Sequence, residues 1–217
     1  MSKPVVVLGA GGHASVLVEL LKQQDRQIMA LIAPQCCDSR LVFHGIPVWE
    51  DDSPLQALSP ECIELVNGIG SLPSSRLRST LFTHYKQVGY RFMTVISAHA
   101  YVSDYAVLAE GVQVMAGAII QTGAWVGENS IINSGAIVEH DCSIGAHCHI
   151  APGAVLSGSV KMANNVHVGT GASVIQSIVI GDSAVIGAGA TVISPIAAEH
   201  TQYVAKGTLS TNRCKGK

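Results

Sequence analysis

Between residues 102 and 192, every sixth residue of the chain is apolar, without exception. A strict period of six is imposed neither by an α-helix, which repeats about every 3.6 residues, nor by an isolated strand, which repeats every two. It is typical of a parallel β-helix, in which short strands stack coil upon coil. The second half of the chain is therefore predicted to be such a β-helix. The series is Val102, Leu108, Val114, Ile120, Val126, Ile132, Val138, Ile144, Ile150, Leu156, Met162, Val168, Val174, Ile180, Ile186 and Val192.

The residues around each apolar position complete a six-residue unit. Two positions earlier, on the same face of the strand, most units carry a small side chain: Ala100, Ala106, Ala118, Ala124, Ser130, Ala136, Cys142, Cys148, Ala154, Ala172, Ala184 and Ala190. Three positions later stand residue types that tolerate a positive φ: Gly111, Gly117, Gly123, Asn129, Gly135, Asp141, His147, Gly153, Asn165, Gly171 and Gly189. Those positions are the predicted corners. Three units close one triangular coil, so residues at equivalent places in successive coils are expected to stack about 4.8 Å from each other.

The composition excludes several classes of protein. With 217 residues, a net charge of −2, 13% charged residues and no basic stripe, the chain is not expected to bind nucleic acid. Its mean hydropathy is high, +0.36, but no apolar run approaches the roughly 18 residues that span a bilayer. The sequence starts without a signal-peptide pattern, and its six cysteines have neither zinc nor disulfide spacing. A reduced, cytoplasmic protein without a metal or membrane contact is predicted.

The first 95 residues are predicted to form a Rossmann-like α/β domain, ahead of a β-helix domain at 96–217. A strand at 5–8 runs into Gly9, Gly11 and Ala14, which match the G-x-G-x-x-A turn that binds phosphate at a helix start. A second strand at 28–32 ends without the acidic residue that NAD binding requires. A nucleotide or nucleotide-sugar phosphate is the favoured ligand, with NAD or an empty tight turn as alternatives. A strand at 63–66, a loop at 67–71 and a helix at 76–89 are expected to follow.

The best catalytic candidate is His140, which stands beside Asp141 at a predicted corner. The same slot in other units holds polar residues that a dry interior would not accept: Asp104, Glu110, Thr122, Glu128, Asn164 and Asp182. His140 is therefore expected to face outward, where the carboxylate of Asp141 can orient the imidazole. Gly158, one full coil further on, should place a bare backbone N–H beside it to meet an oxyanion. The alternative is a solvated surface histidine.

Histidines and cysteines near this corner also suggest a metal site, but the predicted geometry disfavours it. Cys142 and Cys148 fall in the inward small slot, whereas His140 and His147 fall at corners. No metal is therefore expected. His149 and His167 are separated by one full coil and should stack on one face, either lining a ligand site or lying on plain surface.

Two blocks carry a family resemblance: Gly-x-Gly-Gly-His at 9–13 and Glu-His-Asp-Cys-x-Ile-Gly at 139–145. With the hexapeptides, they make the chain resemble bacterial sugar acetyltransferases that join a small nucleotide-sugar domain to a left-handed β-helix. It is similar to the UDP-4-amino-sugar N-acetyltransferases of bacillosamine-type synthesis and to the sialic acid O-acetyltransferases. The resemblance implies acetyl-CoA as co-substrate and a homotrimer with each site between neighbouring prisms.

The resemblance also assigns roles to residues. It implies that His140 is the general base, Asp141 its orienting acid and Gly158 the oxyanion-hole amide. It implies that His13 lies on the substrate side and that Asn133 and His149 line the active site and the acetyl-CoA site. Gly11 and Gly12, from the glycine-rich turn, are further candidates for binding the substrate. His167, which is stacked on His149, is a further candidate on the acetyl-CoA side, although ligand lining is favoured for His149. Transfer of acetyl to the 4-amino group of a UDP-linked sugar is the expected reaction. O-acetylation of a sugar hydroxyl and a non-catalytic β-helix scaffold are the alternatives.

Two stretches depart from the pattern of the family. Acidic residues usually follow the second strand, where this chain has Ala-Pro-Gln-Cys at 33–36. The usual Gly-x-Pro-Ala-Lys near the C-terminus is reduced to Val-Ala-Lys-Gly at 204–207. The first departure concerns the nucleotide contact and the second the CoA contact.

Overall fold

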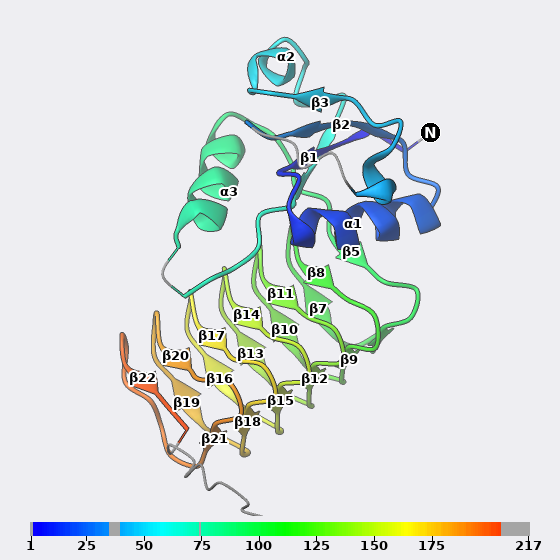
Figure 1. Ribbon diagram of the computed structural model, residues 1–217. Helices are drawn as coiled ribbons and strands as arrows, with labels where there is room; N and C mark the ends of the chain where they lie inside the picture. Colours follow the sequence, from blue (N-terminus) through cyan, green and yellow to red (C-terminus); the bar gives the residue numbers. More distant parts are fainter. Residues whose placement is uncertain (1, 35–39, 74, 205–217) are drawn as a thin grey trace, which may run out of the picture.

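The computed structural model describes residues 2–34, 40–73 and 75–204. An α/β unit formed by the first part of the chain sits on one end of a three-sided prism formed by the rest (Figure 1). None of the helices in these ranges is long and apolar enough to cross a membrane.

The α/β unit is built on a parallel sheet of four strands in the order β3-β2-β1-β4. Its strands are β1 (Val5–Leu8), β2 (Ile28–Ile32), β3 (Val48–Trp49) and β4 (Glu64–Asn67). Its helices are α1 (Gly12–Gln23), α2 (Ser53–Gln56), α3 (Leu77–Gln87) and a 3₁₀ turn η1 (Leu41–Phe43). The predicted strands at 5–8 and 28–32 are confirmed, and that at 63–66 lies one residue later. The short strand β3 carried no recognisable pattern of its own.

The prism has three parallel sheets, one for each side. The first holds β7 (Val107–Leu108), β10 (Trp125–Val126), β13 (Ser143–Ile144), β16 (Lys161–Met162) and β19 (Val179–Ile180). The second holds β5 (Val95–Ile96), β8 (Gln113–Val114), β11 (Ile131–Ile132), β14 (His149–Ile150), β17 (His167–Val168), β20 (Val185–Ile186) and β22 (Thr201–Gln202). The third holds β6 (Tyr101–Val102), β9 (Ile119–Ile120), β12 (Ile137–Val138), β15 (Val155–Leu156), β18 (Ser173–Val174) and β21 (Thr191–Val192). Strands in successive coils pair in register, as between Ile137 and Val155, so the predicted stacking is confirmed.

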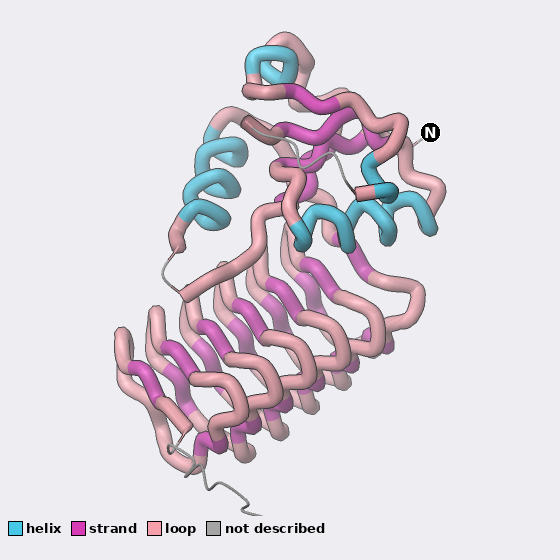
Figure 2. The backbone as a smooth tube through the Cα atoms, viewed as in Figure 1, coloured by secondary structure: helices cyan, strands magenta, loops and turns pink. Residues whose placement is uncertain are grey.

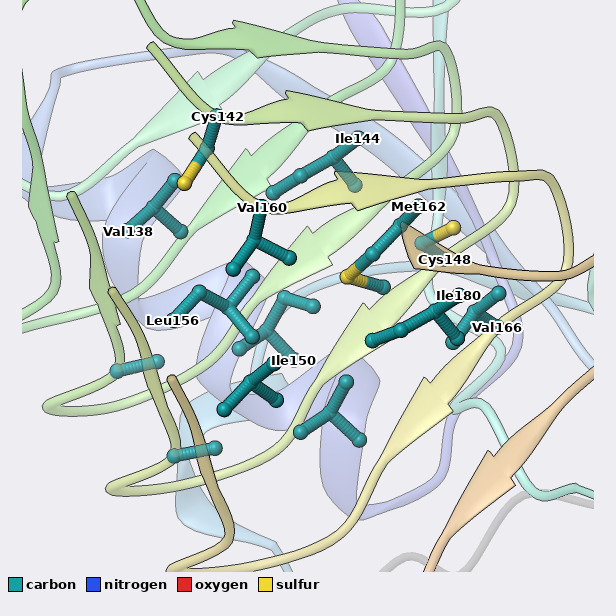
Figure 3. Packing of buried hydrophobic residues seen from close by; sticks show 14 of the residues in the cluster. Val138, Cys142, Ile144, Cys148, Ile150, Leu156, Val160, Met162, Val166 and Ile180 are labelled. Atoms are coloured by element: carbon teal, nitrogen blue, oxygen red, sulfur yellow. The ribbon is translucent and has the colours of Figure 1, made fainter. Parts of the chain in front are cut away.

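The interior of the prism is filled by the period-six residues and by the small residues two positions before them (Figure 3). Cys142 and Cys148 both point into this core and are 1% exposed, as their slot predicted. Val102 and Leu108 are only partly buried, because their strands β6 and β7 end their sheets and have no further strand beneath them. The apolar period therefore supplies the core that holds the coils together.

Every predicted corner of the prism has a positive φ, including Asp141 at 59° and His147 at 59°. Ser159, Ser177 and Ser183 complete the set with φ values of 56° to 61°. Serine has little preference for a positive φ. At these three positions the left-handed conformation is therefore imposed by the closure of the triangular coil.

Helix α1 lies between the parallel sheet and the prism (Figure 2). Its apolar face, with Leu17 and Leu21, shares one buried cluster with β1 above and with Met115 and Ile131 of the prism below. The opposite face of the sheet is covered by α2 and α3 through a second cluster that includes Phe82. The α/β unit is thus seated on the side of the prism formed by β5, β8 and β11, and this contact positions the glycine-rich turn of α1 above that side.

Candidate active site

The His140 side chain stands at the corner between β12 and β13, exposed to solvent as predicted. Its Nδ1 lies 2.9 Å from Oδ2 of Asp141. A carboxylate only accepts hydrogen bonds, so Nδ1 carries a hydrogen, and in the neutral imidazole Nε2 is then the acceptor. The left-handed backbone of Asp141 turns its side chain back toward its neighbour at this corner. The pair therefore presents an imidazole nitrogen that can accept a proton.

Gly158 lies one coil further on, against the face of this imidazole. A Cβ built on Gly158 would stand 2.5 Å from Nε2 of His140 and 2.6 Å from Cε1. The backbone N–H of the next residue, Ser159, donates to the carbonyl of His140 at 2.9 Å. Within the described part of the chain, the N–H of Gly158 itself has no acceptor. The predicted stacking of residues 140 and 158 is confirmed.

Asn133 and His149 form a second cluster, on the side of the prism that bears the α/β unit. Oδ1 of Asn133 accepts from the backbone N–H of Ser134 at 2.8 Å, which directs its Nδ2 to Nε2 of His149 at 3.0 Å. Nε2 of His149 is therefore an acceptor, and its Nδ1 carries the hydrogen. That Nδ1 is buried without a partner among the described residues. The backbone of Ser71 interacts with this ring and favours a proton on it.

His167 stacks on His149 in the next coil, with ring centroids 4.9 Å apart at 76°. Burial, followed by repulsion from His167, His13 and Arg78, lowers the pKa of His149 to about 3. Burial also lowers the pKa of His167. Both rings are neutral at physiological pH, so this face offers uncharged hydrogen-bonding groups.

The glycine-rich turn leads from β1 into α1, which starts at Gly12 with Gly11 as its N-cap and no acidic residue in the first turn. This end of the helix has free backbone N–H groups that attract a phosphate. Gly9 has φ 97°, as the sharp turn requires. His13 is largely buried, and burial together with the charge of Arg78 lowers its pKa to about 4.

A cleft of about 550 Å³ opens at the carboxyl ends of β1 and β2, the usual place for a ligand in such a sheet. Gly9 and Gly11 line it on one side, and the acidic stretch 50–52 lines it on the other. These acids follow β3, the neighbour of β2 in the sheet. Sequence reasoning looked for acidic residues after the second strand and missed them, because only the sheet order brings the end of β3 to the cleft.

Arg40 is a second residue that sequence reasoning missed. Its Nη2 lies 3.8 Å from the position that a Cβ on Gly12 would occupy. The guanidinium therefore stands beside the glycine-rich turn, although the two are far apart in the chain. Residues 35, 36 and 205–207, in the two departures from the family pattern, lie outside the described residues.

The two clusters lie on opposite sides of one prism. His140, Asp141 and Gly158 occupy the corner between the sheet of β13 and the sheet of β12. His149 belongs to the remaining sheet, which faces that corner across the interior. A single chain therefore does not bring its own His140 to its own His149.

The comparisons with known proteins agree with this architecture. Residues 4–83 match the PglD N-terminal domain family, and residues 123–158 match the bacterial transferase hexapeptide family. No curated protein sequence is a match for the chain. One similar solved structure is perosamine N-acetyltransferase from Caulobacter crescentus with CoA and GDP-perosamine, with one histidine replaced by asparagine. It has 34% sequence identity and a TM-score of 0.82, and the match covers 93% of each chain.

Another similar structure is the acetyltransferase domain of PglB from Neisseria gonorrhoeae with acetyl coenzyme A. It has 30% identity and a TM-score of 0.83, and the match covers 93% of this chain and 96% of that one. WeeI from Acinetobacter baumannii shares the fold at 24% identity and a TM-score of 0.79, with 92% and 96% covered. The chain belongs to the bacterial sugar acetyltransferases with a left-handed hexapeptide β-helix, and it is an acetyltransferase.

Proposed function

We propose that the protein transfers the acetyl group of acetyl-CoA to the 4-amino group of a UDP-linked amino sugar. Residues 1–95 hold the nucleotide sugar, and residues 96–217 carry out the transfer. The observation that carries this proposal is the free Nε2 of His140, oriented by Asp141 and facing the bare backbone of Gly158. The relatives that bind CoA with GDP-perosamine, or acetyl coenzyme A alone, support the class of both substrates.

In the proposed reaction the sugar amine attacks the thioester carbonyl carbon, and the C–S bond to CoA breaks. His140 accepts the proton that the amine loses, through Nε2, and passes it to the departing CoA thiolate. Asp141 holds the ring in the required tautomer and stabilises the imidazolium. The N–H of Gly158 donates to the oxyanion that forms on the carbonyl oxygen.

On the substrate side, the nucleoside lies in the cleft at the carboxyl ends of β1 and β2, beside the acids at 50–52. Its diphosphate binds at the start of α1, at Gly11 and Gly12, next to the guanidinium of Arg40. The sugar then extends toward His13 and Asn133. His149 and His167 line the acetyl-CoA side of the same face.

We propose that the active site is completed between copies in a homotrimer. The His140 corner and the His149 face of one chain lie on opposite sides of the prism, so a neighbour's corner must meet this chain's face. The outward positions of β7, β10 and β19 are apolar and exposed: Val107 at 55%, Trp125 at 44% and Val179 at 51%. Ser143 and Lys161 occupy the same outward position in β13 and β16, so the apolar residues lie at both ends of this side and polar residues lie between them. Exposed apolar side chains of this size support an interface between prisms.

The test is a panel of nucleotide sugars assayed with acetyl-CoA, with release of free CoA thiol as the readout. UDP- and GDP-linked 4-amino sugars are compared with the same sugars bearing a 4-hydroxyl and with sialic acid. Release with the UDP-linked amine supports the proposal. Release only with hydroxyl acceptors would make the enzyme an O-acetyltransferase, and preference for the GDP-linked amine would correct the nucleotide.

A further inference from the structure

A chain of buried polar side chains runs through the seam between the α/β unit and the prism. Its members are Arg78 of α3, Asn67 of β4, Gln113 of β8 and Asn129 at a prism corner, none of them more than 5% exposed. The guanidinium of Arg78 donates to three backbone carbonyls, those of Asn67 at 2.8 Å, Ile69 at 2.7 Å and Asn129 at 3.1 and 3.2 Å. These bonds fix the Asn67 carbonyl rigidly in the seam.

The direction of each hydrogen bond at Gln113 follows from this anchor. The Asn67 backbone carbonyl can only accept, so the Gln113 atom at 2.9 Å from it is the amide nitrogen, Nε2. The amide oxygen of Gln113 then points the other way, to Nε2 of His13 at 2.7 Å. An amide oxygen can only accept, so Nε2 of His13 must carry the hydrogen. In a neutral imidazole the other nitrogen, Nδ1, is then an acceptor.

We propose that Gln113 is a positioning residue that holds His13 in its Nε2–H form and thereby presents Nδ1 to the nucleotide sugar as a hydrogen-bond acceptor. The substrate group opposite Nδ1 is therefore a donor, a sugar hydroxyl or an amine N–H. This inference rests on the proposed function for the identity of that substrate, whereas the state of His13 itself does not depend on it.

The surroundings of His13 favour the neutral ring that this role requires. Gln113 contacts it from the prism, and it contributes a dipole and no charge. The charge of Arg78 on α3 and the burial of the ring both disfavour a second proton. His149 of β14 is close enough to interact electrostatically and is neutral as well. No carboxylate among the described residues contributes to the charge balance at His13.

A structural role alone would also explain why Gln113 is buried, so the first measurement is the tautomer. ¹⁵N NMR of the histidine-labelled full chain, with His13→Gln used to assign the signal, reports which nitrogen is protonated at pH 7. We expect Nε2–H in the wild type and a mixture of both tautomers in Gln113→Leu. Gln121→Leu, at a partly buried position of the same prism, is the control for the loss of a glutamine amide that does not contact His13. An Nδ1–H signal in the wild type would overturn the proposal.

The second measurement separates KM from kcat. Gln113→Leu should raise KM for the nucleotide sugar about tenfold, the loss of about one hydrogen bond, while kcat and KM for acetyl-CoA stay close to those of Gln121→Leu. In Gln113→Glu the carboxylate still accepts from Nε2–H but stabilises the imidazolium. KM should then rise as the pH falls from 7 to 5, whereas the wild-type KM stays flat.

The outcomes distinguish the two proposals. If no amino sugar is turned over, the proposed function fails, and the tautomer measurement still decides the role of Gln113. If the wild type is active and neither variant changes the tautomer or the pH dependence of KM, Gln113 only packs the seam. If Gln113→Leu fails to fold, the pH dependence of KM in Gln113→Glu still tests the role of Gln113.

Discussion

Nε2 of His140 lies against the Cα of Gly158, one coil further along the prism, so closely that a Cβ at that position would stand 2.5 Å away. The register of the β-helix creates this contact, because equivalent residues of successive coils stack in line. The same contact explains why this slot takes a glycine, because any side chain would displace the ring of His140. It makes the basic nitrogen and the free backbone N–H neighbours without any loop to position them.

Removing the proposed base should lower turnover without unfolding the protein. His140→Ala is expected to reduce kcat by about 10²–10⁴-fold, the usual contribution of a general base, with an unchanged Tm because the side chain is exposed. Asp141→Asn, which tolerates the positive φ at this corner, should reduce kcat less. The double variant should be no slower than His140→Ala, because the two residues act as one unit. Losses that multiply in the double variant would contradict the pairing.

Gly158→Ala should block the imidazole sterically. The added methyl group must displace the ring of His140, so we expect kcat to fall to within about tenfold of the His140→Ala value. In the His140→Ala background the obstacle is gone, and Gly158→Ala should then change neither kcat nor Tm further. Thiol-release kinetics and thermal unfolding of the four proteins measure this. A Gly158→Ala variant with wild-type turnover would show that residue 158 does not face the reacting atoms.

The buried histidines should make the fold sensitive to acid. The pKa of His149 is about 3 and that of His13 about 4 in the folded state, below the ordinary 6.5. The unfolded chain therefore binds more protons between these values, and the stability present above pH 6.5 is lost as the pH falls toward 4. Each group contributes at most about 1.4 kcal/mol per pH unit in that window. Denaturant unfolding at pH 7 and pH 5 should show a shallower loss in His149→Gln than in the wild type, and equal losses would refute this.

Arg78 and Arg76 are close in sequence but should differ strongly in their effect on stability. Arg78→Met leaves the buried carbonyls of Ile69 and Asn129 without donors, at about 1–3 kcal/mol each, so we expect a loss of about 3–5 kcal/mol. The exposed side chain of Arg76 bonds only to Ser183 among the described residues, so Arg76→Met should cost less than about 0.5 kcal/mol. Urea unfolding of both variants measures the difference. A similar loss for both would mean that the bonds of Arg78 contribute little to the seam.

The repeat determined most of the fold from the sequence alone. A period of six identifies strand, corner and interior, and the stacking of one coil on the next then pairs His140 with Gly158 and His149 with His167 by counting along the chain. The glycine-rich turn was equally readable, because its residue types and spacing follow from a local backbone requirement. These features depend on residues that are neighbours in the sequence or are separated by a fixed number of residues. Both relationships can be read directly from the sequence.

The tertiary structure decided the contacts between elements that are not separated by a regular spacing in the sequence. The acids at 50–52 reach the cleft at the carboxyl ends of β1 and β2 only because β3 pairs with β2. Gln113 meets His13 only because α1 seats on one side of the prism. That same seating puts the α/β unit on the side of His149 and away from the corner of His140. The sequence determined each coil of the prism, because a coil is formed by residues that are near neighbours in the chain. The docking of the α/β unit on the prism depends instead on surface shape and on buried hydrogen bonds, which exist only in the folded chain.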